Sequence, residues 1–198
     1  MISNKQIRAN ARAVLGGNIF AGNWLLALVI GLIHTFGLKL LDNFAGIGSL
    51  LLMSFLTYGY ACVFLPIIRA KKEKVEIPAY FGGTEQIGGL VVLSLMTNLF
   101  VFLWSLLFII PGFVKAYAYS MAPYIKYDHP EYSWKRCLNE SKAMMKGYKW
   151  KLFCLDLSFI GWNIVGMLCF IVGMYWVLPY TKAAQVCFYE ELKKVHEA

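Results

Sequence analysis

The chain contains apolar stretches that are longer than a water-soluble domain of this size can bury. Four of them lie at about 19–41, 44–68, 87–127 and 152–186. A membrane-spanning helix needs about 20 apolar residues, at a rise of 1.5 Å each. The first two stretches each fit one span, whereas the last two are each too long for one. With 59% hydrophobic and 15% charged residues, this pattern predicts an all-α, multi-pass membrane protein.

Each of the two longest stretches contains a break at which a helix can end. Pro111-Gly112 interrupts the third stretch, and Gly173 interrupts the fourth. Because proline and glycine kink or terminate helices, we interpret each of these stretches as two helices that double back. The sequence therefore predicts a single membrane domain of six membrane helices in three hairpins, at about 19–68, 87–127 and 152–190. The helix at about 113–127 is short enough to be tilted or only partly inserted.

The positions of Lys and Arg favour six spans over four. Basic residues collect in the cytoplasmic loops of membrane proteins. With six spans and a cytoplasmic N-terminus, 17 of the 19 basic residues face the cytoplasm, and only Lys39 and Lys115 lie near the outer side. With four spans, the segment 115–151 would carry eight basic residues outside. We therefore expect both termini in the cytoplasm, and lipid rather than nucleic acid as the partner of the net charge of +8.

Two polar segments are predicted to form amphipathic helices at the membrane surface, at 2–15 and 133–147. In the second, Ser133 is a plausible N-cap and Gly147 a plausible C-cap. Its apolar face holds Trp134, Leu138, Ser141 and Met145, and its polar face holds Lys135, Asn139, Lys142 and Lys146. Basic interfacial helices bind anionic lipid. The candidate contacts with lipid headgroups are Lys135, Arg136, Lys142 and Lys146.

Polar residues inside the spans are candidate functional residues, since a charge at mid-bilayer costs about 2.5–3.5 kcal/mol. They are His34, Asn98, Lys115, Asp156 and Asn163. Asp156 is interpreted either as a clamp between helices, bonded to the interfacial helix or to Tyr124, or as a proton or cation site. Lys115 is expected to reach the outer headgroups. His34 is expected to be a packing residue, and the two asparagines are expected to bond between helices.

Catalytic and metal-binding motifs are absent from the sequence. There is no H-E-x-x-H, G-x-S-x-G or phosphate-binding loop, and the five cysteines lack the spacing of zinc ligands. The carboxylates form no close pair inside a predicted span. We therefore predict no catalytic residue, no metal and no cofactor, and a protein that is not an enzyme.

Several segments resemble a known family. They read Leu-Trp-Ser-Leu-Leu-Phe-Ile-Ile-Pro-Gly at 103–112, Lys-Ala-Tyr-Ala-Tyr-Ser-Met-Ala-Pro-Tyr at 115–124, Ser-Lys-Ala-Met-Met-Lys-Gly-Tyr-Lys-Trp at 141–150 and Asp-Leu-Ser-Phe-Ile-Gly-Trp at 156–162. Over nearly the whole chain, the sequence resembles the bacterial membrane family known as domain of unknown function 975. That resemblance implies a multi-pass protein of the bacterial plasma membrane. It implies no activity and no catalytic residue.

Two classes of function remain open. The first is a non-enzymatic membrane module, with an accessory, scaffolding or envelope-related role, acting through anionic lipid, a protein partner or a homo-oligomer. The second is a small transporter or channel-like carrier with a polar site between broken helices. Pro66, Pro123 and Pro179 lie 57 and 56 residues apart, and either three similar units or coincidence explains this spacing.

Overall fold

The computed structural model describes residues 2–16, 24–25, 28–29, 32, 47–70, 87–107, 109–168 and 172–197. Within these ranges every regular element is a helix, so the prediction of an all-α protein is confirmed for the described residues. The helices are α1 (Asn4–Leu15), α3 (Ile47–Ala70), α5 (Ile87–Leu107), α6 (Ile109–Tyr119), α7 (Ala122–Asp128), α8 (Trp134–Met144), α9 (Lys149–Leu168) and α10 (Val172–Glu197).

The N-terminal helix α1 begins at a complete capping box. The Ser3 side chain accepts from the backbone N–H of Gln6, and the Gln6 side chain accepts from the backbone N–H of Ser3. Ile7, Ala11 and Leu15 recur every four residues and are fully buried. The helix predicted at 2–15 therefore exists, and its apolar face packs mainly against α10.

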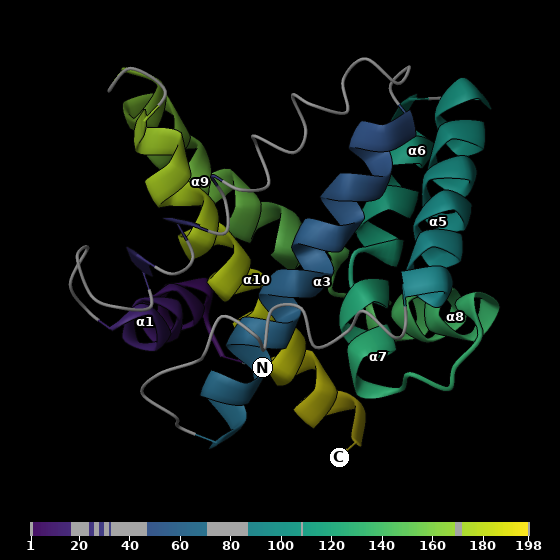
Figure 1. The fold of residues 1–198 in the computed structure, drawn as a ribbon, viewed down its shortest axis with the longest axis horizontal. Coiled ribbons are helices and arrows are strands. Elements are labelled where there is room, and N and C mark those ends of the chain that lie inside the picture. Colours follow the sequence, from purple (N-terminus) through teal and green to yellow (C-terminus); the bar gives the residue numbers. More distant parts are fainter. Residues whose placement is uncertain are drawn as a thin grey trace.

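Helices α5 and α6 form a tight hairpin, in which α6 runs back alongside α5 (Figure 1). Pro111 lies in the first turn of α6, where its missing N–H leaves no hydrogen bond unmade. At Gly112 the two helices approach so closely that a Cβ atom would lie 2.1 Å from Ser105 Oγ and 2.8 Å from Ser105 Cα. The Pro111-Gly112 pair thus both starts the returning helix and permits its close contact with α5.

The last two helices form a second hairpin. Helix α9 ends at Leu168 and α10 begins at Val172, so that Gly173 is the second residue of α10. The two helices pack along each other (Figure 1). Helix α10 continues through Pro179 to Glu197, beyond the end of the predicted hairpin at 190. Helix α3 packs against α5, α7 and α10 and thereby joins the two hairpins.

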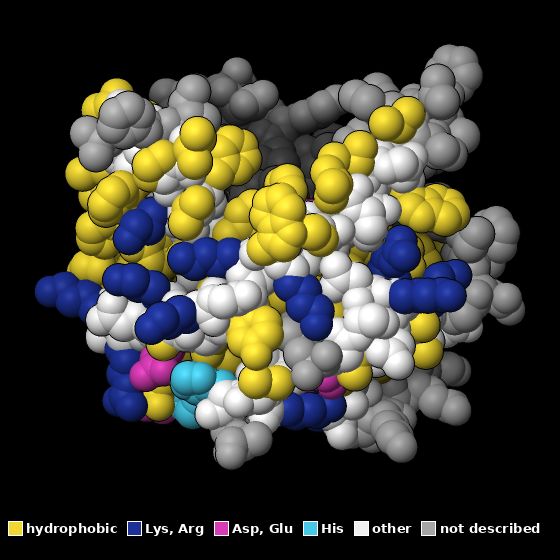
Figure 2. All heavy atoms as spheres, turned by 180° about the vertical axis from the view of Figure 1, so that it is seen from behind, with side chains coloured by type: hydrophobic (Ala, Val, Ile, Leu, Met, Phe, Trp, Pro, Cys, Tyr) yellow, Lys and Arg dark blue, Asp and Glu magenta, His cyan; other side chains and the backbone are white. Residues whose placement is uncertain are grey.

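The two ends of the molecule differ in their surfaces. At one end, α1, α7 and α8 pack against α3, α9 and α10 and enclose a hydrophobic core. Its largest fully buried side chains include Tyr60, Phe64, Tyr124 and Phe188. At the other end, large apolar side chains of α5, α6 and α9 are exposed, including Leu106 and Ile110 at 78% each. Figure 2 shows Lys and Arg side chains in a band across the middle of this face, with mostly apolar side chains above them.

One helix meets the length and hydropathy of a membrane span. Among the described residues, only Gly88–Leu106 in α5 is long and apolar enough to cross a bilayer, and 17% of its most apolar window is buried. The core helix of a soluble protein passes the same test, but such a core helix is mostly buried, unlike Gly88–Leu106. This helix therefore supports an association with a membrane, whereas the six membrane helices stay a prediction.

Candidate functional site

Three of the four predicted lipid-facing residues lie on the exposed face of helix α8, and the fourth, Lys146, lies in the turn that follows it. Lys135, Arg136, Lys142 and Lys146 are all exposed, whereas Leu138, Ser141 and Met145 are buried. Ser133 takes the N-cap position without a side-chain hydrogen bond, and Gly147 adopts a left-handed conformation at φ +85° in the turn before α9. The Arg136 guanidinium lies 3.7 Å from the centre of the Tyr132 ring. The sequence therefore assigned both faces of this helix as the structure has them.

A buried serine fixes α8 to the rest of the molecule. Ser141 Oγ donates to the backbone carbonyl of Ala118 at 2.8 Å and accepts from the backbone N–H of Met121 at 3.2 Å. The side chain bonds to both partners at the junction between α6 and α7. Because a buried hydroxyl needs such partners, Ser141 sets the position of α8 along α6, and with it the position of the basic face.

Asp128, at the end of α7, is the centre of an ion cluster that joins three helices. Its Oδ2 atom accepts from Arg69 of α3 at 2.7 Å, from Lys193 of α10 at 2.8 Å and from the Tyr189 hydroxyl at 2.8 Å. Arg69 also bonds Glu190, with its Nε 2.9 Å from Oε1. The side chain of Asp128 is only 3% exposed. This Asp128 cluster therefore holds α3, α7 and α10 together at the charged end.

The hydrogen bonds to Asp128 decide its protonation state. Burial by itself raises the pKa of this carboxyl, but the hydrogen bonds from Arg69, Lys193 and Tyr189 outweigh burial and leave the pKa below its ordinary value. The bond to Asp128 is also the main reason why the pKa of Arg69 is raised. Asp128 is thus an anion at neutral pH, and the cluster is held together by charge as well as by hydrogen bonds.

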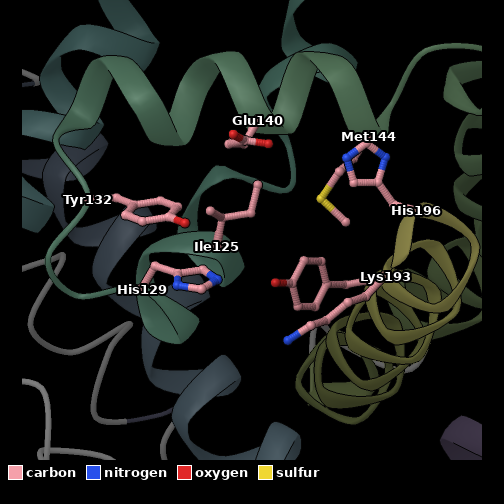
Figure 3. A pocket seen from close by; sticks show the side chains of 8 residues that line it. Ile125, His129, Tyr132, Glu140, Met144, Lys193 and His196 are labelled. Carbon is pink, nitrogen blue, oxygen red and sulfur yellow. The ribbon is translucent and has the colours of Figure 1, made fainter. Parts of the chain in front are cut away.

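A small pocket lies beside the Asp128 cluster, between α7, α8 and α10. Its volume is about 130 Å³. Figure 3 shows Glu140 and Met144 on α8, His129 and Tyr132 on one side, and Lys193 and His196 of α10 on the other. The rings of His129 and Tyr132 stack with their centres 4.3 Å apart. Within the part of the chain that the structure describes, no group of His, Cys, Asp or Glu side chains has the geometry of a metal site.

Asp156 lies half-buried between α9 and α10, and its partners differ from those expected. Gln185 of α10 donates to Oδ1 at 3.3 Å, and the Tyr117 hydroxyl and the Lys182 ammonium also interact with the carboxylate. The partners thus come from α6 and α10, not from the interfacial helix. The Tyr124 hydroxyl is buried without a hydrogen-bond partner, so the predicted bond from Tyr124 is not formed. The contacts favour the clamp interpretation, because they join three helices.

The structure does not gather the other polar candidates into one site. Asn98 is half-buried on α5, and Asn163 is exposed on α9. Lys115 has its Nζ 4.5 Å from the centre of the Trp104 ring. Its expected position near the outer headgroups stays a prediction. His34 lies outside the described residues.

Comparison with known proteins concerns the second half of the chain. A family model described as "Protein of unknown function (DUF975)" matches residues 108–196. Residues 108–196 belong to the DUF975 family. The match runs from α6 to α10 and is shorter than the resemblance seen in the sequence, which extends over nearly the whole chain. No curated protein and no solved structure matches the chain.

The DUF975 region contains most of the features described above. It includes α8, the pocket and Asp156, together with every member of the Asp128 cluster except Arg69. Sequence analysis did not predict this cluster, because its members lie far apart in the chain. The signal in the sequence was weak, because Asp128 is one of three acidic residues in the segment 126–151, which also contains seven basic residues.

Proposed function

We propose that the chain is a non-enzymatic multi-pass module of the bacterial plasma membrane, whose basic face holds it to anionic lipid on the cytoplasmic leaflet. The proposal places six membrane helices as three hairpins, with both termini in the cytoplasm. An accessory, scaffolding or envelope-related role fits such a module, with a protein partner or a second copy of the chain as a further contact.

One observation carries the proposal: exposed basic and exposed apolar surfaces adjoin each other. Lys135, Arg136 and Lys142 on α8 and Lys146 in the turn after it face solvent, and the exposed apolar side chains of α5 and α6 begin next to α8. A soluble monomer rarely exposes so large an apolar surface. A bilayer covers both surfaces at once, because its acyl chains meet the apolar end and its headgroups meet the lysines.

The alternative of a transporter has less support. It requires a polar cavity at mid-membrane, which was expected near His34, Asn98 or Asn163. His34 lies outside the described residues, and the pocket beside the Asp128 cluster is lined by neither Asn98 nor Asn163. The clamp-like contacts of Asp156 give no support to a transport site either.

The lipid contact can be measured through stability in nanodiscs of defined composition. The wild-type protein should melt at a higher temperature in phosphatidylglycerol than in phosphatidylcholine. Each lysine or arginine near an anionic surface contributes about 1 kcal/mol of attraction. A variant with glutamine at Lys135, Arg136, Lys142 and Lys146 should therefore lose most of this difference. The control is the variant Lys194→Gln, at an exposed position near the end of α10. It should keep most of the difference in melting temperature between the two lipids. Equal melting temperatures of the wild-type protein in both lipids would contradict the proposal.

The topology can be tested with a single cysteine in place of His129, in a background that lacks the native cysteines. His129 is 42% exposed, so that a thiol at this position is accessible to a reagent. The proposed arrangement places it in the cytoplasm. A membrane-impermeant maleimide should therefore label it in inverted vesicles and leave it unlabelled in intact cells. Labelling from outside intact cells would rule out the six-helix arrangement.

A further inference from the structure

Helix α5 presents a continuous apolar stripe at the outer edge of the helix bundle (Figure 1). The members of this α5 stripe recur at alternating intervals of three and four residues, and they are Val92, Leu95, Leu99, Phe102 and Leu106. Their exposure lies between 39% and 78%. At a rise of 1.5 Å per residue the stripe is about 21 Å long. Two helices that cross at about 20° can pack along such a stripe.

Asn98 borders the α5 stripe, near the middle of the helix. It is half-buried, and the exposed side chains of Leu95 and Phe102 lie one turn away on either side. Its amide makes no hydrogen bond with any residue in the described part of the chain, whereas the neighbouring Thr97 bonds the carbonyl of Leu93. Asn98 is about 13 Å or more from both ends of α5. With α5 across a bilayer, neither water nor headgroups reach this amide, so it needs a partner from another helix.

The chemistry of the α5 face fits a second copy of the same face. Acyl chains offer no hydrogen-bonding group, so lipid alone leaves Asn98 unsatisfied. An asparagine amide both donates and accepts, and two copies related by a two-fold axis can therefore satisfy each other. Among the described helices only α5 lacks a charged residue. Two copies of this face thus meet without the repulsion that a net charge of +8 imposes elsewhere on the molecule.

We propose that two copies of the chain associate through the α5 stripe, with the Asn98 amides bonded to each other near the middle of the bilayer. The inference rests on the proposed function, because α5 must lie across a membrane. It deepens that function by naming the partner and the surface that receives it. A single polar residue beside an apolar seam fixes the register of two helices. The exposed side chains of α6 and α9 stay in contact with lipid.

Cysteine crosslinking in membranes can locate the interface. A single cysteine replaces Leu99 in the full-length protein without its native cysteines, and oxidation should convert most of this variant to a disulfide-linked dimer. The matched control is Ile160→Cys on α9, because Ile160 is 48% exposed and Leu99 is 49% exposed. The control should remain monomeric. Equal crosslinking of both variants would indicate random collisions and would overturn the proposal.

The contribution of Asn98 can be measured in liposomes, from energy transfer between labelled copies as the protein is diluted with lipid. Asn98→Leu should weaken the dimer about tenfold, which is the usual order for a hydrogen bond between membrane helices. Asn98→Gln retains the amide and should preserve most of the affinity. Asn163→Leu removes the same group from an exposed position on α9 and should leave the dimer unchanged. Equal effects of the two leucine variants, or no effect of Asn98→Leu, would overturn the Asn98 contact.

Extraction of the membranes with alkaline carbonate separates failure of the dimer from failure of the proposed function. If Leu99→Cys stays monomeric in a protein that resists extraction, lipid or another segment of the same chain covers the stripe. The dimer is then wrong, while the proposed function stands. If carbonate extracts the wild-type protein, α5 does not cross the bilayer and both proposals fail. The crosslinking result does not depend on the folding of any Asn98 variant.

Discussion

Replacing Asp128 with asparagine should lower the free energy of unfolding by about 2–3 kcal/mol. The change removes the charge that Arg69 and Lys193 share, and it leaves Glu190 as the carboxylate that still pairs with Arg69. Breaking a buried ion pair from one side costs about 3–5 kcal/mol. The side chains of Arg69 and Lys193 are 36% and 28% exposed, so that water recovers part of this cost. The measurement is unfolding of the purified protein in mixed detergent micelles.

The difference in stability between the wild-type protein and Asp128→Asn should depend on pH. Because the folded-state pKa of Asp128 lies below its ordinary value, the carboxylate stabilises the fold above about pH 4. This contribution is lost as the pH falls through the folded-state pKa. The wild-type protein and Asp128→Asn should therefore become similar in stability at acid pH. A difference that stays constant from neutral to acid pH would contradict the role of the cluster. Glu131→Gln, which removes an exposed carboxylate three residues away, should change the stability little.

Replacing Gly112 with alanine should destabilise the protein by about 3 kcal/mol, at the upper end of the usual cost of overpacking. The added methyl group would meet the side chain and the Cα atom of Ser105, and the backbone of α5 cannot move aside as a flexible side chain can. Helices α5 and α6 would then have to separate. The expected result is a lower melting temperature and a reduced yield of monodisperse protein.

Gly161 of α9 offers a matched control for this prediction. A Cβ atom there meets no other atom within 4 Å. Alanine is favoured over glycine inside a helix by about 1 kcal/mol, so Gly161→Ala should be neutral or slightly stabilising. Changing Ser105 to glycine in the Gly112→Ala background should restore only part of the stability, since the contact with Cα remains. Equal effects of the two single alanine variants would show that close helix packing at Gly112 is unimportant.

Local features of the fold were predictable because local sequence determines them. The spacing of charges and apolar residues located α1 and both faces of α8. Pro111-Gly112 and Gly173 located the breaks before α6 and α10 within a few residues. In each case one short segment contains the whole signal. The position of a cap, a break or an amphipathic face follows from residues within a few turns of one another.

Features that depend on distant segments were not predictable in the same way. The Asp128 cluster joins residues that are 59 and 65 positions apart in the sequence. Many basic residues in the charged segments were equally plausible partners, and only the packing of α3 and α10 selects Arg69 and Lys193.

The structure also bears on the spacing of the three prolines. Pro66, Pro123 and Pro179 lie in α3, at the start of α7 and in α10, and α3 contacts both of the other helices. A basic residue follows each proline at the third position, namely Arg69, Lys126 and Lys182. Helix α8 packs on the hairpin that precedes it, and α1 packs on the last hairpin. The two described interfacial helices thus share one packing arrangement, and the interpretation as three similar units stays a prediction.

The packing of α1 against α10 has a consequence for how the protein is made. Asn4 bonds the carbonyl of Lys151, Lys151 bonds the carbonyl of Ile2, and Tyr180 bonds the carbonyl of Arg8. The ribosome synthesises α1 first, but the surfaces that receive it emerge last. During translation Ile7, Ala11 and Leu15 therefore remain without their final packing partners until the C-terminal hairpin has been synthesised.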